Sequence, residues 1–149
     1  MDESLLDERD GCSLSNVGLC APPECSGGSC PLSLLDIGIV HLGVGALPRA
    51  HQPDYTDQAI SKGDRRWGIL GASLRSAETR DALAPQDFLY TLAESDEAGE
   101  RCRVIGSLRG VLVAPENPQA LIEAMCLPSV KTGSLTVPAQ GTRPAPPPG

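Results

Sequence analysis

An apolar segment that ends in two closely spaced glycines limits the possible folds more than any other part of this chain. Residues 36–45 read DIGIVHLGVG, a run rich in β-branched side chains that stops at Gly43 and Gly45. Such a run is typical of a buried parallel strand that enters a tight turn. Two glycines at this spacing fit a turn that brings the backbone close to a phosphate, because the first makes the bend and the second leaves room. They fit an ordinary loop equally well.

The segments after these glycines continue an alternation of strands and helices. A helix is expected to follow the turn and to end at Gly63. The side chains that this helix should bury are Ala50, Tyr55, Ala59 and Ile60. The sequence WGILGASL then predicts a second buried strand, and SAETRDALA a short helix with Ser76 as N-cap and Glu78 in its first turn. Strand, helix, strand, helix is the beginning of a doubly wound sheet.

The hydrophobic pattern changes after the second helix. Apolar and polar positions alternate on both sides of the turn-forming SDEAG, which predicts an antiparallel hairpin over residues 88–108. Asn117 as N-cap and Pro118 as the first helical residue then open a further helix. Its larger apolar side chains share one face: Leu121, Ile122 and Met125. A last apolar strand, GSLTV, closes the folded unit at Val137.

Composition divides the 149 residues into three zones. Residues 1–36 are rich in Ser, Gly, Pro and Cys without a sustained period, which predicts an irregular lead. Residues 37–137 carry the periodic segments and form the expected domain, while residues 138–149 predict a disordered, Pro-rich tail. Hydrophobic residues make up 40% of the chain but aromatic residues only 3%. The core is therefore expected to consist of Leu, Ile, Val and Ala.

The charge of the chain argues against a nucleic-acid surface. The net charge is -7, and no cluster of Lys and Arg offers the basic patch that phosphate backbones require. No apolar run approaches the roughly 20 residues that span a bilayer. The first residues, MDESLLDERD, lack the basic region of a secretory signal. We therefore expect a soluble, cytoplasmic protein with no membrane or nucleic-acid partner.

Cysteine and histidine residues give no clear metal site. Four of the six cysteines crowd the first thirty residues: Cys12, Cys20, Cys25 and Cys30. Their spacing matches the paired ligands of zinc sites poorly and no histidine is near, so reduced thiols are expected rather than a metal centre. His41 lies inside the first strand and is predicted to be a hydrogen-bonded core residue. His51 is either a surface residue or part of the glycine turn, and neither histidine is assigned to proton transfer.

Three segments together resemble the mannitol dehydrogenase family. They read GIVHLGVGALPRAHQPDYTD, WGILGASLRSAETRDALAPQDFLYTL and RVIGSLRGVLVAPENPQALI, and they agree with the family in order and spacing. The family contains long-chain polyol-specific dehydrogenases together with fructuronate and tagaturonate reductases. The resemblance covers residues 37–137 and implies a truncated, partial Rossmann-like α/β domain. It also implies an NAD(P)-dependent oxidoreductase that moves a hydride between a nicotinamide and a polyol or sugar acid.

The resemblance also implies which residues bind the cofactor. Gly43 and Gly45 would line the pyrophosphate turn, and Arg49 would lie near the cofactor phosphates. Glu78 would be the acidic residue that accepts hydrogen bonds from the adenosine ribose, which favours NAD because a carboxylate repels a 2'-phosphate. Nearby arginines, Arg75 and Arg80, leave NADP open. Glu78 at the start of a helix is also explained by the helix dipole alone.

Departures from the family pattern limit this reading. Relatives commonly read GAFHRAHQ at the turn, whereas this chain has Leu47 and Pro48 there and Pro53 five residues later. A proline inside a helix costs roughly 3 kcal/mol, so the first helix is expected to restart near Pro53. The family's catalytic C-terminal domain has no counterpart here, so no catalytic residue is assigned and the chain alone is expected to be inactive. A non-catalytic module that binds a nucleotide or a partner, and a non-functional truncated product, remain alternatives.

Overall fold

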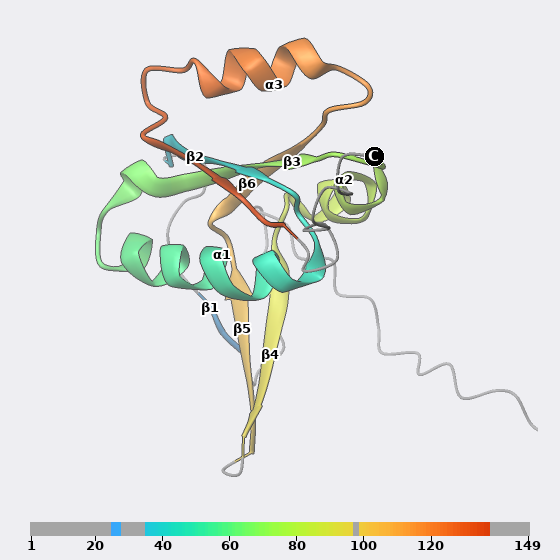
Figure 1. Ribbon diagram of the computed structural model, residues 1–149. Coiled ribbons are helices and arrows are strands. Elements are labelled where there is room, and N and C mark those ends of the chain that lie inside the picture. Colours follow the sequence, from blue (N-terminus) through green and yellow to red (C-terminus); the bar gives the residue numbers. More distant parts are fainter. Residues whose placement is uncertain (1–24, 28–34, 97–98, 138–149) are drawn as a thin grey trace, which may run out of the picture.

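A four-stranded parallel sheet is the centre of the molecule. The computed structural model describes residues 25–27, 35–96 and 99–137 of the chain. The sheet has the strand order β6-β3-β2-β7, and all of its pairings are parallel. Its strands, seen edge-on in Figure 1, are β2 (Ile37–Leu42), β3 (Gly68–Ser73), β6 (Leu108–Val113) and β7 (Thr132–Leu135). The two buried strands predicted from the sequence are β2 and β3, and both predictions are confirmed.

The sheet order has a topological consequence. Counted along the chain, the four parallel strands lie in the order third, second, first, fourth, which is the beginning of the dinucleotide-binding arrangement. The first strand, β2, therefore has β3 on one side and β7 on the other. The chain leaves β2 toward β3 and returns to the opposite side of β2 only with β7. The predicted doubly wound α/β fold is confirmed.

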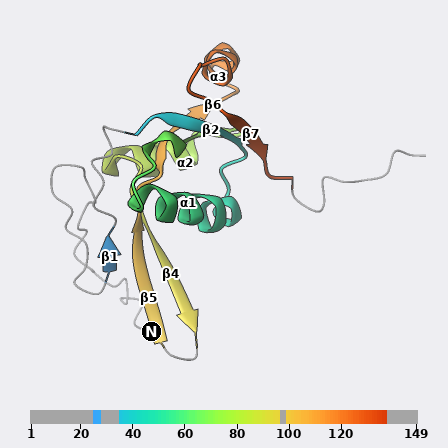
Figure 2. The ribbon, with the colours of Figure 1, turned by 90° about the vertical axis from the view of Figure 1, so that its left-hand side faces the viewer.

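Helices cover the two faces of this sheet. Helix α1 (Ala46–Ser61) lies on one face and α3 (Pro118–Met125) on the other, as the two views in Figures 1 and 2 agree. The short helix α2 (Glu78–Leu83) packs beside β6. Its N-cap residue is Ala77 and no side chain caps it, so the prediction of Ser76 as N-cap is wrong. The Ser76 carbonyl instead accepts a hydrogen bond from Ser73 Oγ.

A second, smaller sheet contains the predicted hairpin. Strands β4 (Tyr90–Asp96) and β5 (Gly99–Ile105) pair antiparallel and extend past α1, away from the larger sheet (Figure 1). This confirms the hairpin. Beside β5 lies a strand that was not predicted, β1 (Cys25–Gly27), which pairs parallel to it. The lead was expected to be irregular, and at these three residues that expectation is wrong.

The pairing of β1 with β5 also changes the expected cysteine chemistry. It sets Cys25 opposite Cys102, so the fold brings part of the cysteine-rich lead next to a cysteine that is distant in sequence. Cys102 takes part in a disulfide, whereas Cys126 is an exposed free thiol. The expectation that all six cysteines are reduced is therefore wrong for Cys102. Cys12, Cys20 and Cys30 lie outside the described residues.

Helix α1 runs through Pro53 without a break, so the expected restart of the helix at that residue is wrong. Pro53 has no N–H to donate to the Arg49 carbonyl one turn earlier. The Tyr90 hydroxyl donates to this carbonyl instead, over 2.7 Å, and the Ser107 hydroxyl donates to the carbonyl of Pro53 itself, also over 2.7 Å. Pro48 costs no hydrogen bond, because it is the third residue of the helix, where an N–H has no intrahelical acceptor.

The buried face of α1 is largely polar. The hydrophobic pattern of the sequence therefore predicted the wrong side chains to be buried. Ile60 is buried as expected, but Tyr55 and Ala59 are exposed. The residues that α1 buries beside Ile60 and Pro53 are Asp54, Thr56 and Asp57. These carboxylates have partners: Asp54 lies 2.9 Å from the Arg103 guanidinium, and Asp57 accepts a hydrogen bond from the Gly106 N–H. The helix ends at Ser61, two residues before the predicted stop at Gly63, whose φ of 106° suits the left-handed residue after a helix.

The hydrophobic core lies between α1, α2 and the sheet. Every buried hydrophobic residue among those described is Leu, Ile, Val or Ala, as expected. The main cluster contains Ile39, Val44, Ile69, Leu83, Leu108 and Val111. Strand β6, which supplies the last two, was not predicted separately from the hairpin that precedes it. No helix within the described ranges is long and apolar enough to cross a membrane.

Candidate functional site

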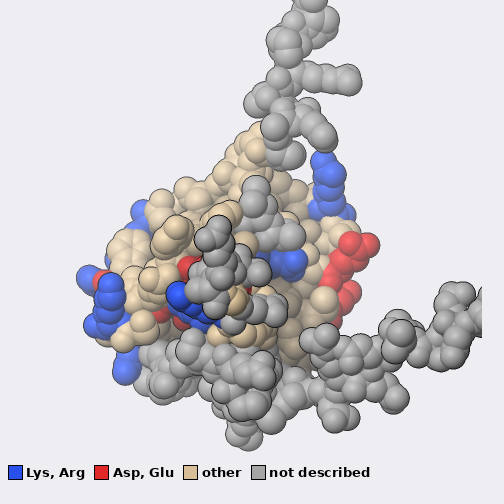
Figure 3. Space-filling view, turned by 90° about the horizontal axis from the view of Figure 1, so that it is seen from below, with Lys and Arg blue, Asp and Glu red and all other residues tan. Residues whose placement is uncertain are grey.

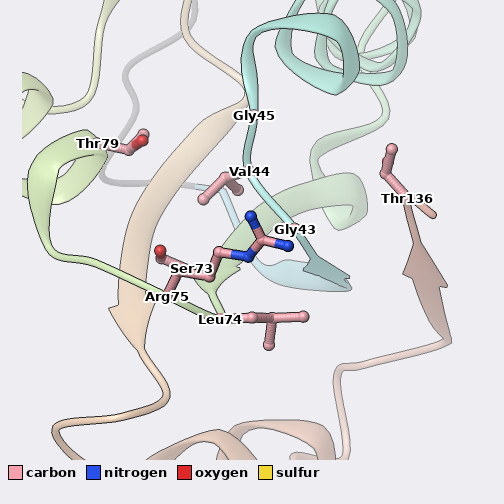
Figure 4. Close-up of a pocket in the computed structure, with 8 residues that line it drawn as sticks. All are labelled: Gly43, Val44, Gly45, Ser73, Leu74, Arg75, Thr79 and Thr136. Carbon is pink, nitrogen blue, oxygen red and sulfur yellow. The ribbon is translucent and has the colours of Figure 1, made fainter. Parts of the chain in front are cut away.

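A cavity of about 370 Å³ opens at the carboxyl ends of the parallel strands. Four segments line it: the turn after β2, the end of β3 with the loop that follows, the start of α2, and the residue after β7. Its lining residues, shown in Figure 4, are Gly43, Val44, Gly45, Ser73, Leu74, Arg75, Thr79 and Thr136. This is the point at which the strand order reverses, and open α/β sheets bind their ligands in the crevice at such a point.

The glycine turn after β2 has room for a ligand but not for a side chain at its first position. Gly43 has a φ of 92°, which favours glycine, and a Cβ there would lie 3.3 Å from the Thr136 carbonyl oxygen. The Gly43 N–H donates to the Ala72 carbonyl at 2.8 Å, which holds the turn against β3. The turn therefore requires glycine at this position, as the sequence predicts.

The second glycine of the turn, Gly45, is the N-cap of α1. No side chain caps this helix, and its first turn contains no acidic residue. Uncapped N–H groups at a helix N-terminus carry partial positive charge and suit an anion such as a phosphate. The missing N–H of Pro48 removes one donor from this end, and Ala46 and Leu47 keep theirs.

Close packing between the glycine turn and the sheet depends on a residue that sequence reasoning missed. Val44 is buried, and its Cγ1 lies 2.3 Å from where a Cβ on Gly71 would be. Gly71 is in the middle of β3, so the absence of its side chain lets the turn settle onto the strand. The third glycine of the usual G-x-G-x-x-G pattern has such a packing role, but Pro48 stands at that position here. The available signal for this contact was Gly71, the second glycine of WGILGASL.

A hydrogen-bonded network on the α1 face of the sheet positions Thr136. His41 Nδ1 lies 2.7 Å from Ser134 Oγ, and His41 Nε2 lies 3.0 Å from Thr136 Oγ1. Ser134 Oγ donates its proton to Gln52 Oε1 over 3.1 Å, so it accepts from His41 Nδ1, and His41 Nε2 then accepts from the Thr136 hydroxyl. Burial lowers the pKa of His41, which favours the neutral ring that this network needs. The predicted core role of His41 is confirmed.

The predicted site residues do not all lie in the cavity. Gly43 and Gly45 line it, whereas Arg49 and Glu78 are not among the lining residues. Arg49 is half-buried in the first turns of α1, and Glu78 is the exposed first residue of α2. Their roles toward a cofactor stay predictions. His51 is exposed on α1.

Sequence reasoning missed the lining residues that come from other elements. Ser73 ends β3 and was missed, whereas Arg75, which follows the strand, was named from the sequence only as a residue that leaves NADP open; Figure 4 shows its guanidinium directed toward the cavity. Thr136 follows β7, which is distant in sequence but adjacent to β2 in the sheet. The signal for Ser73 and Thr136 was their place as the second-last residue of a predicted strand, WGILGASL or GSLTV.

The charges of the described residues suit a small anionic ligand better than a polyanion. Among the described residues, Arg75 is the one charged residue that lines the cavity. On the face seen in Figure 3, Lys and Arg side chains lie at several separate places rather than in one patch. Among residues 25–27, 35–96 and 99–137, no group of three His, Cys, Asp or Glu side chains is placed to hold a metal ion.

Known proteins are similar to this chain in sequence and in fold. The sequence profile of the Mannitol dehydrogenase Rossmann domain matches residues 37–147, ten residues beyond the domain boundary predicted above. The mannitol 2-dehydrogenase of Cereibacter sphaeroides is 48% identical over 103 residues, which are 67% of this chain and 22% of that protein. That of Aspergillus fumigatus is 45% identical over 107 residues, 70% of this chain and 21% of that protein.

Solved structures agree with these sequence matches. The Pseudomonas fluorescens mannitol 2-dehydrogenase, in a ternary complex with NAD and D-mannitol, is 41% identical with a TM-score of 0.73. It covers 77% of this chain, which covers 24% of that one. A D-sorbitol dehydrogenase in substrate-free form is 32% identical with a TM-score of 0.70, over 77% of this chain and 25% of that one. The chain thus spans about a quarter or less of the length of the proteins that it matches.

Proposed function

The chain belongs to the mannitol dehydrogenase family, and from that premise we propose that it is the NAD-binding part of an oxidoreductase acting on a polyol or a sugar acid. The observation that supports this most is the cavity at the strand-order reversal, where the glycine turn and the N-terminus of α1 meet Thr136. The known relatives named above include one whose structure holds NAD and D-mannitol. A cytoplasmic location, without nucleic-acid or membrane partners, completes the proposal, and the net charge of -7 supports the absence of a nucleic-acid partner.

The residues of the cavity fit a dinucleotide. A pyrophosphate needs a backbone that it can approach closely and donors of partial positive charge, and the Gly43 turn and the uncapped end of α1 supply these. A bound nicotinamide would supply the chemistry, since it accepts or gives the hydride. Thr136, held by His41, would orient the part of the cofactor that lies between β2 and β7. Arg49 would support the phosphates from the side of α1.

We assign the adenosine ribose to the end of β3. Glu78 at the start of α2 would accept hydrogen bonds from the ribose hydroxyls, and Ser73 lines the cavity at the end of β3. Arg75 points into the same cavity and would pair with a 2'-phosphate, so NADP is the second candidate cofactor. The negative charge of Glu78 favours NAD.

Titration of the purified chain with NADH, followed by nicotinamide fluorescence, tests the proposal. We expect saturable binding that Gly45→Val abolishes, because its side chain would occupy the place of the pyrophosphate. Ala59→Val, an exposed position on the same helix, is the control and should leave binding unchanged. Equal binding by the wild type and Gly45→Val would remove the turn from the site.

The choice between cofactors has its own test. Glu78→Ala should weaken NAD more than NADP, because the substitution removes a ribose acceptor and also a repulsive charge. Glu123→Ala, an exposed acid on α3, should change neither affinity. A larger loss for NADP than for NAD would exclude Glu78 as the ribose-binding residue.

A further inference from the structure

Two arginines near the adenosine end of the proposed cofactor site differ in what holds them. Arg75 lies in the loop after β3 and Arg80 in α2. The Arg75 guanidinium is directed toward the cavity (Figure 4), whereas Arg80 is not among the lining residues, although its neighbour Thr79 is. Because Arg80 adjoins a lining residue, its own contacts decide whether its charge is available to a ligand.

The Arg80 guanidinium is held by two carboxylates. Glu116 takes both of its terminal nitrogens: Nη1 donates to Oε2, and Nη2 donates to Oε1 over 3.3 Å. Asp81 accepts from the third nitrogen, Nε, at 2.8 Å. A contact through both terminal nitrogens fixes the orientation of a guanidinium as well as its position. Arg80 is therefore held at Glu116, away from the cavity.

The backbone around Glu116 is fixed on both sides. Its N–H donates to the Val113 carbonyl at the end of β6 over 3.0 Å, and the following residue, Asn117, is the N-cap of α3. The Ala114 N–H donates to the Ser73 carbonyl at 2.9 Å, which joins this turn to the end of β3. Ser73 itself lines the cavity. Glu116 thus has a set position beside the strand end at which the cavity opens.

The charges around α2 disfavour a 2'-phosphate as long as Arg80 is occupied. Carboxylates outnumber guanidinium groups there, since Glu78, Asp81 and Glu116 face only Arg75 and Arg80. Two of these carboxylates hold Arg80. Within this group of five residues, Arg75 is therefore the one cation left to meet a phosphate.

We propose that Glu116 is a positioning residue that determines cofactor specificity: by holding Arg80, it keeps that guanidinium from a 2'-phosphate and favours NAD over NADP. This inference rests on the proposed NAD site and assigns part of its selectivity to a second element. Glu78 would face the ribose hydroxyls, whereas Glu116 acts only through Arg80. Without Glu116, Arg80 becomes a second phosphate donor beside Arg75, and two guanidinium groups suit a phosphate better than one.

The affinities of the purified 149-residue chain for NADH and NADPH, measured by nicotinamide fluorescence, test the proposal through their ratio. Glu116→Gln should tighten NADPH binding by about fivefold and leave NADH binding unchanged, because Arg80 is released. Asp81→Asn is the matched control. It removes the same charge from the same guanidinium but leaves both terminal nitrogens on Glu116, so it should change the ratio much less.

A second background shows whether the gain passes through Arg80. Glu116→Gln should gain clearly less NADPH affinity in a chain that also carries Arg80→Ala, where no guanidinium is released. Equal gains with and without Arg80, or an equal gain from Asp81→Asn, would reduce the effect to general electrostatics and overturn the proposal. Each variant should melt like the wild type in circular dichroism, because exposed ion pairs contribute little to stability.

The Nε–H signal of Arg80 in NMR spectra of the 15N-labelled chain reports the release directly, and Arg80→Ala identifies it. NADPH should shift this signal far more in Glu116→Gln than in the wild type, and equal shifts would overturn the proposal. The cofactor site itself fails separately. If the wild-type chain does not bind NADH, the proposed site is refuted, whereas NADH binding with an unmoved NADPH ratio refutes only the role of Glu116.

Discussion

At the scale of single residues, a proline inside α1 is accommodated by a hydroxyl group from another element. The Tyr90 hydroxyl takes the place of the N–H that Pro53 lacks and donates to the Arg49 carbonyl. Tyr90→Phe should therefore destabilise the chain by about 1–2 kcal/mol in urea unfolding, because a part-buried carbonyl loses its donor. Tyr55→Phe removes an exposed hydroxyl from the same helix and should be neutral. Equal effects of the two substitutions would contradict this account of Pro53.

A second residue-scale prediction concerns the buried carboxylate of Asp57. Burial raises its pKa, although the Gly106 N–H and Arg103 oppose the shift. The folded state therefore binds a proton more tightly than the unfolded state, and stability should fall as pH rises above about 4 toward the raised pKa. Asp57→Asn keeps an oxygen acceptor and should flatten this part of the stability curve. Asp36→Asn, at an exposed site, should leave the slope as it is; a wild-type curve that rises over this range would contradict the assignment.

At the scale of elements, the contact between β3 and the glycine turn sets the shape of the site. Gly71→Ala would place its Cβ 2.3 Å from Val44 Cγ1 and push the turn off the strand. We expect a loss of about 1–3 kcal/mol in stability and weaker NADH binding. Gly110→Ala in the neighbouring strand is the matched control, since its Cβ would meet only the end of the Leu70 side chain at 3.2 Å. A larger effect of Gly110→Ala, measured by the same denaturation, would refute the role of Gly71.

The elements that could be predicted from the sequence are those with local signals. Strands β2 and β3 are continuous apolar runs, and the N-cap of α3 is visible as Asn117 before Pro118. The continuity of α1 could not be predicted, because its donor lies 41 residues further along the chain. Likewise, no local pattern brings Thr136 to the glycine turn, since only the pairing of β2 with β7 does so.

At the scale of the whole molecule, the described residues contain the cavity proposed to bind the cofactor, and no catalytic residue is assigned among them. The chain should not oxidise mannitol at a measurable rate, because hydride transfer also requires a base and a held substrate, and positioning alone supplies about 7–11 kcal/mol of the barrier. Its two lysines, Lys62 and Lys131, do not line the cavity. Absorbance at 340 nm with NAD and mannitol tests this, with a full-length relative as positive control. Steady NADH formation by wild type but not by Gly45→Val would show that catalytic groups are present.

The position of Thr136 in the cavity also determines how early in synthesis the cavity can form. His41 and Ser134, the residues that join the two sides of the network, are 93 positions apart. During synthesis the glycine turn leaves the ribosome long before β7 does. The edge of β2 that pairs with β7 therefore stays without that partner while most of the domain is still being made. Contacts of such sequence separation form slowly. The proposed nucleotide site should therefore form only after β7 has paired with β2, and we expect a nascent chain halted before residue 132 to lack it.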